Sequence, residues 1–420
     1  MSKSDDEDKE ENFFGNKNNN IMPLEEQEVF REMPSPNPND KDKENEKKQK
    51  TETKEKEKEK EKFVSYKDYY SSGYRDPGKE GRKASRIIFL RSFNNWVKAS
   101  MINKYCRRLG KEGVAVLELC CGKGGDLDKY FMNNIKLFVG ADISKESLKN
   151  AMDRLEKIKN EKYKDNFRIK CIFIKDDLSS PDNRFLEKID KNYYFDLVSC
   201  QFALHYHFQN EKRLNAFLTN VSSRLCEGGY FIGTIIEDNV IVKRLRNRKK
   251  MTENKYLKEK FTFGNEYYSV KFSQKHFDVK NGPFGIKYGF YLEDSIDNRD
   301  EEGKIKYVEE YLIVFNEFVE LCKKYDLYLV EKENFTKFYS DYVKIEQFKR
   351  LSERMLKDLN NVNIQQQWEI IQLYMVFAFR KGKENNNNNS KEKNRYIPYL
   401  IKNKIEFMNY EPELNEGTFD

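Results

Sequence analysis

Apolar and polar positions alternate in two different rhythms through the middle of the chain. Short apolar runs typical of buried strands occur at 114–120, 137–143, 169–176, 195–201 and 229–235. Stretches with a helical period separate them, one beginning at Leu127 and others covering 147–157 and 211–225. Strands that alternate with helices in this way indicate a mostly parallel sheet covered on both faces.

The rhythm changes after Ile236. A basic helical stretch, VKRLRNRKKM, leads to FGNEYYSVKF and FGIKYGFYL, which are typical of extra β-hairpin material. An amphipathic helix is then predicted over 309–325, with late strands over 327–332 and 373–381. We therefore expect an α/β fold: a Rossmann-like, doubly wound sheet of seven strands with an inserted β-hairpin and helical lobe. Its ligand should lie at the carboxyl ends of the first strands.

Composition divides the chain into three parts. The first 62 residues hold 14 basic and 19 acidic residues and almost no aliphatic core. We therefore predict a disordered, charged tail over 1–64. The run ENNNNNS begins a predicted Asn-rich linker and C-terminal tail, 384–420, which leaves a single domain over 65–383.

The seven cysteines are scattered without a CxxC pair. We interpret them as reduced, mostly buried thiols, without a disulfide frame or a zinc site, and we expect no metal. No apolar run reaches eighteen residues and the N-terminus is polar and acidic, so neither a membrane span nor a secretory signal is expected.

The first predicted strand ends in a glycine-rich loop, VAVLELCCGKGGDL. It lacks the Ser or Thr that must follow Lys123 in a phosphate-binding P-loop. It also lacks the third glycine of a dinucleotide fingerprint, because that position is Leu127. Asp142, which ends the second strand twenty residues after Gly122, is placed to accept hydrogen bonds from ribose hydroxyls. The loop is therefore expected to approach a ribose-containing ligand through its backbone.

Acidic residues favour a ligand without phosphate at this loop. Glu118 and Asp126 flank the loop and would repel a pyrophosphate, whereas they suit an ammonium or sulfonium group. S-adenosylmethionine has the ribose and both cationic groups, and Asp177 near the end of the third strand could accept from its adenine amino group. The alternative is that these acids cap helices or face solvent.

The fourth strand ends in QFALHYHF, residues 201–208. Phe202 and Tyr206 beside His205 form a flat slot with polar edges, which suits a planar base. His205 could act as a general base, donate a hydrogen bond to a carbonyl, or simply be packed. The sequence leaves these three roles open.

Seven ordered blocks between residues 85 and 381 resemble one family. The blocks are FNNWVK, LELCCGKGGDLDKY, GADIS, QFALHY, GGYFIGT, FGNEYYSVKF and VEEYLIVF. Together they resemble eukaryotic mRNA cap guanine-N7 methyltransferases. The resemblance implies an S-adenosylmethionine-dependent methyltransferase fold and methyl transfer to N7 of the cap guanosine, with S-adenosylhomocysteine as the second product and no metal.

The resemblance also implies two sets of site residues. For the donor, Lys98 would pair with the methionine carboxylate, and the remaining contacts would come from Glu118, Gly122, Asp142 (ribose), Asp177 (adenine) and the backbone of Gln201. For the cap, the guanine would contact Phe202, Tyr206, His205 (O6), Glu310 (N1 and N2) and Tyr374. The cap ribose and triphosphate would contact Asn94, Lys123 and Arg154.

Guanine chemistry gives Glu310 a clear role. N1–H and N2–H₂ are adjacent donors that one carboxylate can accept, and adenine has no such edge. The alternative for Glu310 is an acid in the first turn of a helix, favoured by the helix dipole. The chain departs from the family at three places: Glu118 replaces the usual Asp, Ile236 replaces a proline, and SYKDYYSSGYRD contains no recognisable His-Tyr-Asn segment.

These residues predict catalysis by orientation. Guanine N7 carries a lone pair and no proton, so attack on a sulfonium methyl needs no general base. His205, Tyr206 and Glu310 would orient the base without touching the methyl group. We expect a nuclear monomer that acts on 5′-capped pre-mRNA, with other capping enzymes or the transcription machinery as candidate partners.

Three other readings remain open. The chain could methylate a small planar substrate, bind capped RNA without a donor, or, least favoured, be a nicotinamide dehydrogenase. The part after residue 62, with 64 basic and 52 acidic residues, suits an RNA substrate.

Overall fold

The computed structural model describes residues 63–71, 81, 84–182, 184–247, 261–272, 282–296, 299, 301–357 and 363–382, and the backbone of 413–415. The chain divides into two units, Met1–Lys60 and Glu61–Asp420. The predicted disordered tail lies outside the described residues, except for Phe63 and Val64. The backbone of Val64 forms a β-bridge with that of Val308. The predicted linker after residue 384 also lies outside them, apart from 413–415.

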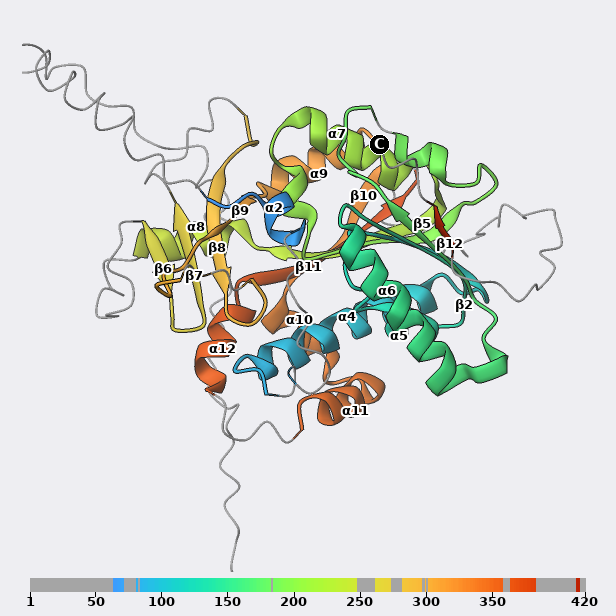
Figure 1. The fold of residues 1–420 in the computed structure, drawn as a ribbon, viewed down its shortest axis with the longest axis horizontal. Helices are drawn as coiled ribbons and strands as arrows, with labels where there is room; N and C mark the ends of the chain where they lie inside the picture. Colours follow the sequence, from blue (N-terminus) through green and yellow to red (C-terminus); the bar gives the residue numbers. More distant parts are fainter. Residues whose placement is uncertain are drawn as a thin grey trace, which may run out of the picture. The chain divides into compact units, whose positions relative to one another are not determined.

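A mixed sheet forms the centre of the second unit (Figure 1). Its order is β10-β11-β5-β4-β1-β2-β3-β12, with β11 antiparallel to both neighbours and β1 to β5 parallel. The seven predicted strands are confirmed, and a short parallel eighth strand is added beside β3. The strands are β1 (Val114–Leu119), β2 (Ile135–Asp142), β3 (Lys170–Lys175), β4 (Phe195–Gln201), β5 (Leu225–Ile236), β10 (Leu327–Asn334), β11 (Tyr374–Lys381) and β12 (Glu413–Asn415).

Strand register brings the polar strand ends together. Leu119, the last residue of β1, pairs with Ala141 on one side and with Cys200 on the other. Because these strands are parallel, the residues that follow them emerge at one edge of the sheet. Asp142 and Gln201 therefore lie on either side of the loop that follows β1.

Helices cover both faces of the sheet. In Figure 1, α7 and α9 lie on one face, and α4, α5 and α6 on the other. Side-chain caps start two of them, because Ser144 accepts from the backbone N–H of Ser147 at α6 and Asn210 from that of Arg213 at α7. The α-helices are α2 (Tyr66–Ser71), α4 (Ile88–Arg108), α5 (Leu127–Phe131), α6 (Lys145–Ile158), α7 (Glu211–Ser222), α8 (Asp238–Asn247), α9 (Phe315–Lys323), α10 (Phe335–Tyr342), α11 (Glu346–Met355) and α12 (Ile364–Ile371). The short helices are η2 (Lys159–Tyr163), η3 (Lys164–Asn166), η4 (Arg184–Lys188) and η5 (Leu204–His207).

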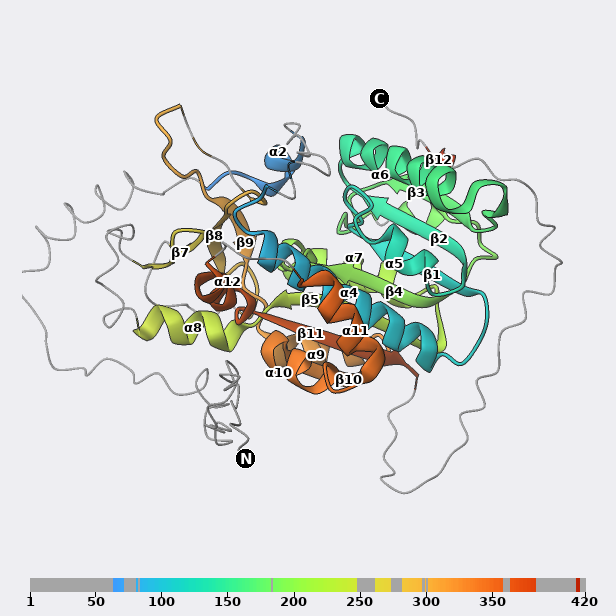
Figure 2. The ribbon, with the colours of Figure 1, turned by 90° about the horizontal axis from the view of Figure 1, so that it is seen from below.

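The inserted β material forms a second, antiparallel sheet in the order β6-β7-β8-β9. It consists of β6 (Thr262–Gly264), β7 (Tyr268–Phe272), β8 (Lys287–Leu292) and β9 (Val308–Tyr311). Its edge strand β9 packs against η5 and α2. Figure 1 shows α2 beside β9, and Figure 2 shows β7, β8 and β9 side by side. The second sheet therefore reaches the same edge of the central sheet as the loop after β1.

The helix predicted over 309–325 is wrong in its first part. Val308–Tyr311 is a strand, and the helix covers only Phe315–Lys323. The reason is that residues 311–315 are all buried, so their apolar run carries no helical period. Glu310 is consequently a strand residue, and its alternative reading as a first-turn helix acid is wrong. No described helix is both long and apolar enough to cross a membrane.

Candidate active site

Two glycines shape the loop between β1 and α5 for different reasons. Gly122 has a φ of +51°, and a Cβ placed on it would meet nothing within 4 Å. Gly124 has a φ of +66°, and its Cβ would lie 2.8 Å from Leu127 Cδ1 and 3.1 Å from Ala151 Cβ. Gly124 thus lets the loop pack on α5 and α6, whereas Gly122 leaves an open face on which a ligand can approach the backbone.

Asp142 holds this loop in place. Its Oδ2 accepts from the backbone N–H of Gly122 at 2.8 Å, and its Oδ1 accepts from that of Ser144 at 2.9 Å. Burial raises the pKa of this carboxyl, although both backbone bonds favour its ionised form. Each carboxylate oxygen can accept a second hydrogen bond, so Asp142 can hold the loop and also receive ribose hydroxyls.

The acids that flank the loop have pKa values shifted in opposite directions. Nζ of Lys98 lies 2.8 Å and that of Lys129 2.7 Å from Oδ1 of Asp126. Burial opposes ionisation of Asp126, but Lys129 and Lys98 outweigh it and hold the pKa of the carboxyl below its usual value. Burial and then the Asp126 charge raise the pKa of Glu118 well above normal. Lys98 therefore reaches a carboxylate of the chain itself, and the pKa values of Glu118 and Asp126 are shifted in opposite directions.

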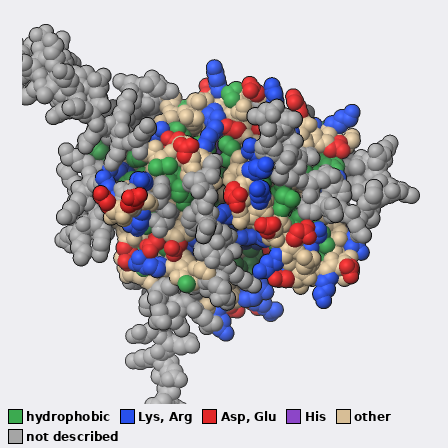
Figure 3. Space-filling view, in the orientation of Figure 1, with side chains coloured by type: hydrophobic (Ala, Val, Ile, Leu, Met, Phe, Trp, Pro, Cys, Tyr) green, Lys and Arg blue, Asp and Glu red, His purple; other side chains and the backbone are tan. Residues whose placement is uncertain are grey.

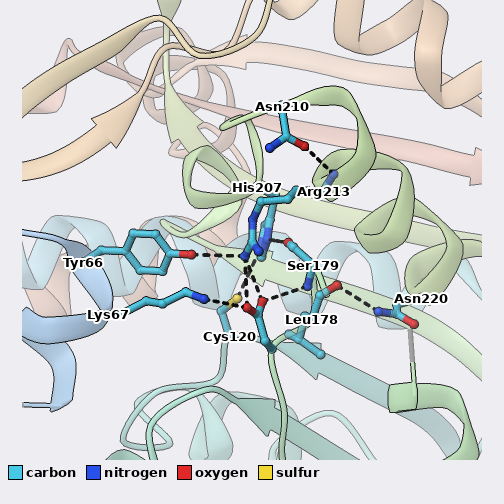
Figure 4. A network of polar contacts seen from close by, with 10 residues as sticks. Tyr66, Lys67, Cys120, Leu178, Ser179, His207, Asn210, Arg213 and Asn220 are labelled. Carbon is cyan, nitrogen blue, oxygen red and sulfur yellow. Dashed lines mark hydrogen bonds and ion pairs between the residues drawn. The ribbon is translucent and has the colours of Figure 1, made fainter. Parts of the chain in front are cut away.

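Asp177 is engaged by two cations, Lys67 and Arg213, both of which are labelled in Figure 4. Its Oδ2 lies 2.8 Å from Nζ of Lys67, and its Oδ1 lies 2.9 Å from a guanidinium nitrogen of Arg213. Burial alone would raise the pKa of Asp177. The hydrogen bond from Lys67 and the charge of Arg213 have the larger combined effect, so the pKa lies below its usual value. An adenine amino group would have to share or replace these partners.

The side chain of Gln201 is used inside the protein. Its Nε2 donates to Ser199 Oγ at 2.9 Å, and its Oε1 accepts from the Thr234 hydroxyl at 3.0 Å. These two bonds hold the side chain in place, and the predicted contact of its backbone with a ligand stays a prediction.

A cleft of about 1190 Å³ opens beside these strand ends. Its lining includes the predicted cap residues Asn94, Arg154, Phe202, His205, Glu310 and Tyr374, together with the predicted donor residue Lys98. Tyr206 and Lys123, although both are described, do not line it. Ile236, at the position of the family's proline, forms part of the apolar wall.

A buried carboxyl lies in this cleft. Glu310 is 1% exposed, and its Oε2 accepts from the hydroxyl of Tyr288 at 2.7 Å. Its Oε1 lies 3.4 Å from Nε2 of His205, a nitrogen to which no described residue gives a hydrogen bond. Burial raises the pKa of Glu310 to about 8 and lowers that of His205 to about 3. The contact therefore joins a neutral imidazole to a protonated carboxyl at pH 7, and it is not an ion pair.

Aromatic rings bound the same space. Phe202 has a φ of +57°, and its ring centroid lies 5.2 Å from that of Tyr374 and 6.1 Å from that of Phe335, edge to face in both pairs. The Lys98 ammonium lies 5.9 Å from the centre of the Phe202 ring. Lys98 therefore lies between Asp126 at the strand ends and the aromatic rings of the cleft.

Helix α2 contributes three residues that sequence reasoning missed. The Tyr66 ring stacks on Tyr206 at 4.5 Å, and the Tyr70 and Tyr206 hydroxyls lie 3.1 Å apart. Tyr70 itself lines the cleft, and Lys67 reaches Asp177. The cluster of tyrosines in SYKDYYSSGYRD was the available signal, but nothing in its spacing indicates the partner. Tyr288 was also missed, because only the pairing of β8 with β9 places it beside Glu310.

The whole body of the chain matches one family. Residues 51–382 match the family described as mRNA (guanine-N(7))-methyltransferase domain. The mRNA cap guanine-N(7) methyltransferase 1 of Oryza sativa subsp. japonica is 34% identical over 351 residues, which cover 81% of this chain and 88% of that protein. The protein of the same name from Arabidopsis thaliana is 34% identical, covering 76% of this chain and 81% of its own length.

A fungal relative and a solved structure are also similar. The mRNA cap guanine-N(7) methyltransferase of Schizosaccharomyces pombe is 32% identical, covering 73% of this chain and 79% of that protein. An S-adenosylmethionine-dependent methyltransferase from Clostridium acetobutylicum ATCC 824 covers 69% of this chain and 92% of its own at 16% identity, with a TM-score of 0.40. That likeness is remote, and it bears on neither the donor nor the acceptor.

Proposed function

Because the chain belongs to the mRNA (guanine-N(7))-methyltransferase family, we propose that it transfers a methyl group from S-adenosylmethionine to N7 of the guanosine that caps an RNA. The observation that carries the proposal is Glu310, a carboxyl buried at the cleft between the neutral imidazole of His205 and the hydroxyl of Tyr288. A buried carboxyl with one hydrogen-bonded oxygen, and the other 3.4 Å from Nε2 of His205, suits a ligand with two adjacent donors. Guanine presents such a pair at N1 and N2.

The strand ends fit the donor. Gly122 offers an open backbone face, Asp142 retains acceptor capacity, and Oε2 of Glu118 is buried with no hydrogen-bond partner among the described residues. Lys98 and Asp177 would exchange their present partners for the donor's carboxylate and adenine amino group. When bound, S-adenosylmethionine supplies an electrophilic methyl group on a positively charged sulfur.

The acceptor side orients the base and compensates charge. Guanine N7 needs no deprotonation, and the His205 imidazole, with its pKa lowered to about 3 by burial, stays neutral and cannot titrate as a base near pH 7. Methylation at N7 leaves a positive charge on the guanine ring. An ionised Glu310 in this low-dielectric cleft would stabilise that charge as it develops. Catalysis in this proposal comes from orientation and electrostatics.

The cleft can also hold more of the methyl acceptor than its base. Asn94, whose Oδ1 is buried with no hydrogen-bond partner among the described residues, lines it together with Arg154. Blue Lys and Arg side chains gather along the lower edge of Figure 3, where Figure 1 places α11. That helix supplies Lys349, Arg350 and Arg354, and Arg350 and Arg354 also line the cleft. Cations on this path would hold the triphosphate and the following RNA.

The proposal extends to the setting of the enzyme. The catalytic domain would span 65–383 and act as a nuclear monomer on 5′-capped pre-mRNA. Other capping enzymes or the transcription machinery would be its partners.

The test is a methyl-transfer assay with S-adenosylmethionine and three RNAs that differ only in the cap base: guanosine, inosine and adenosine. We expect 7-methylguanosine from the first cap, a much slower reaction with inosine because N2 is missing, and none with adenosine. Equal rates with the guanosine and inosine caps would refute the assigned role of Glu310. No product from any cap, with donor binding intact, would favour a methyltransferase for a small planar substrate.

A further inference from the structure

A cluster of sulfur and imidazole ligands lies beneath the donor loop. The Sγ atoms of Cys120 and Cys200 and a ring nitrogen of His207 all lie within 4.8 Å of one another. Cys120 follows β1, Cys200 lies near the end of β4, and His207 ends η5. The cluster is thus assembled from three segments, and the spacing of cysteines along the chain could not reveal it.

The geometry matches that of a tetrahedral thiolate and imidazole site. The Cys120 Sγ lies 3.5 Å from Nε2 of His207, and the Cys120 and Cys200 thiols are in hydrogen-bonding contact. Zinc bonds of about 2.3 Å to sulfur and 2.0–2.1 Å to nitrogen place these two atoms about 3.6 Å apart at the tetrahedral angle. From this geometry we propose that Cys120, Cys200 and His207 bind Zn²⁺, with the fourth position left for water.

The surroundings orient the imidazole as a metal ligand requires. Ser179 Oγ forms a hydrogen bond with Nδ1 of His207, which leaves Nε2 directed toward Cys120, as Figure 4 shows. The ring also stacks on Phe217 at 3.9 Å with an interplanar angle of 18°. A hydrogen bond at one ring nitrogen and a metal at the other is the usual arrangement of a ligating histidine.

The backbone supplies a second argument. Cys120 has a φ of +59°, a left-handed conformation that favours glycine and that L side chains rarely adopt. A thiol kept at such a position indicates that its side chain has a use there. Two cations, Lys67 and Arg213, lie nearby, and both pair with the Asp177 carboxylate.

Zinc at this place would join the two halves of the site. Cys120 precedes the donor loop, and His207 closes the turn that carries His205 and Tyr206. The ion would therefore fix the distance between the donor loop and the turn that holds the acceptor base, although it would touch neither ligand. This departs from the expectation of no metal drawn from the cysteine spacing.

The test uses the full chain, reduced and stripped of metal, titrated with Co²⁺ and then Zn²⁺. We expect about one ion per chain, with sulfur-to-cobalt charge-transfer absorption and tetrahedral d–d bands that Zn²⁺ abolishes. Cys120→Gly and Cys200→Ala should lose these bands, and Ser179→Ala should weaken binding by about 10- to 100-fold. Cys322→Ala, a buried thiol in α9, is the matched control and should keep them.

Folding can be separated from binding, because glycine suits the φ of position 120 and Cys120→Gly should fold at least as well as the native chain. Absence of the cobalt bands in the reduced native chain would overturn the proposal. So would bands that persist in both Cys120→Gly and Cys200→Ala. Neither result depends on methyl transfer, so the zinc site can fail while the proposed enzyme stands.

Discussion

The proposed donor site at the strand ends and the proposed acceptor site in the cleft satisfy their polar groups in different ways. On the donor side, three carboxylates have protein partners: Asp142 accepts from two backbone N–H groups, and Asp126 and Asp177 each pair with two cations. On the acceptor side, Glu310 is almost completely buried with one hydrogen bond, and Nε2 of His205 has none from the described residues.

The pKa shifts follow this difference only in part, because burial also raises the pKa of Asp142 and of Glu118. Cations overcome burial at Asp126 and Asp177 and keep both carboxyls ionised, whereas burial meets only the Tyr288 hydrogen bond at Glu310 and raises its pKa to about 8. At Lys98 and Asp177 a donor ligand would exchange places with existing partners, which changes the free energy little per contact, whereas Oε2 of Glu118 would gain a new partner. An acceptor base supplies Glu310 with new partners, so we expect selectivity to be concentrated there.

Replacing Glu310 is the strongest test of that comparison. Glu310→Ala should lower kcat/KM for guanosine-capped RNA by about 1000-fold or more, because two donors of a buried guanine lose their acceptor. Donor affinity, measured by calorimetry, should not change. Steady-state kinetics with the capped RNA gives the first quantity.

Glu309→Ala is the matched control. Glu309 lies on the same strand and pairs with Lys287 at 2.7 Å on the exposed side. Its removal should change kcat/KM by less than about threefold, as is usual for surface ion pairs. Comparable losses in the two variants would mean that β9 matters for folding and not for base selection.

The second test removes a carboxylate from the proposed donor site. Asp142→Ala removes the acceptor of two backbone N–H groups and of the proposed ribose contact, so donor affinity should fall about 100-fold. Asp142→Asn keeps one acceptor oxygen, so its donor affinity should lie between that of Asp142→Ala and that of the native chain. If donor affinity is unchanged in a folded Asp142→Ala chain, the proposed contact between Asp142 and the ribose is wrong.

A pH titration distinguishes the two sides without mutation. Guanine needs an ionised acceptor, and protonated Glu310 offers only one accepting oxygen, so the proton competes with the cap. With the pKa of Glu310 at about 8, kcat/KM for capped RNA should rise about tenfold per pH unit below that value and level off above it. At saturating cap, kcat should remain flat, because His205 does not titrate in this range. A pKa near neutrality in kcat itself would indicate a catalytic base.

The same shift has a consequence for stability. The folded-state pKa of Glu310 lies above the ordinary value of 4.5, so the folded chain binds this proton more tightly than the unfolded chain. Its contribution is fully present below the ordinary value and is lost as pH rises toward about 8, by on the order of a few kcal/mol. Urea unfolding of the native chain and Glu310→Gln at pH 5 and pH 8 should show this loss only in the native chain.

The strand ends that carry the proposed donor residues could be predicted from the sequence, because these residues follow strands in chain order, and their contacts with a donor stay a prediction. The run that ends at Leu119 and the acid twenty residues after Gly122 are local patterns, and parallel register brings them together. The pairing of Lys98 with Asp126 could not be read in this way, because Lys98 comes from a helix far from the loop in the chain.

The surroundings of Glu310 were harder to predict from the sequence, for a physical reason. Glu310 belongs to an inserted sheet whose edge meets η5, and only the family resemblance indicated it. The fully buried stretch after it mimicked a helix, which concealed β9 and therefore the partner Tyr288. The spacing of the cysteines along the chain gave the expectation of no metal site. Spacing could not show that the ends of two strands and a helix bring Cys120, Cys200 and His207 together.

The mildest test concerns Lys67, which pairs with Asp177 at 2.8 Å and has a side chain 44% exposed. Surface ion pairs contribute little, and Arg213 would still hold Asp177 in Lys67→Ala. Donor affinity should therefore rise, by no more than about threefold, because one competitor for the carboxylate is gone. Arg213→Ala, which removes the less exposed partner, should have the larger effect and should also lower the thermal unfolding temperature. If Lys67→Ala instead weakens donor binding tenfold, Lys67 holds the donor itself. The donor side would then depend on single contacts just as the acceptor side does.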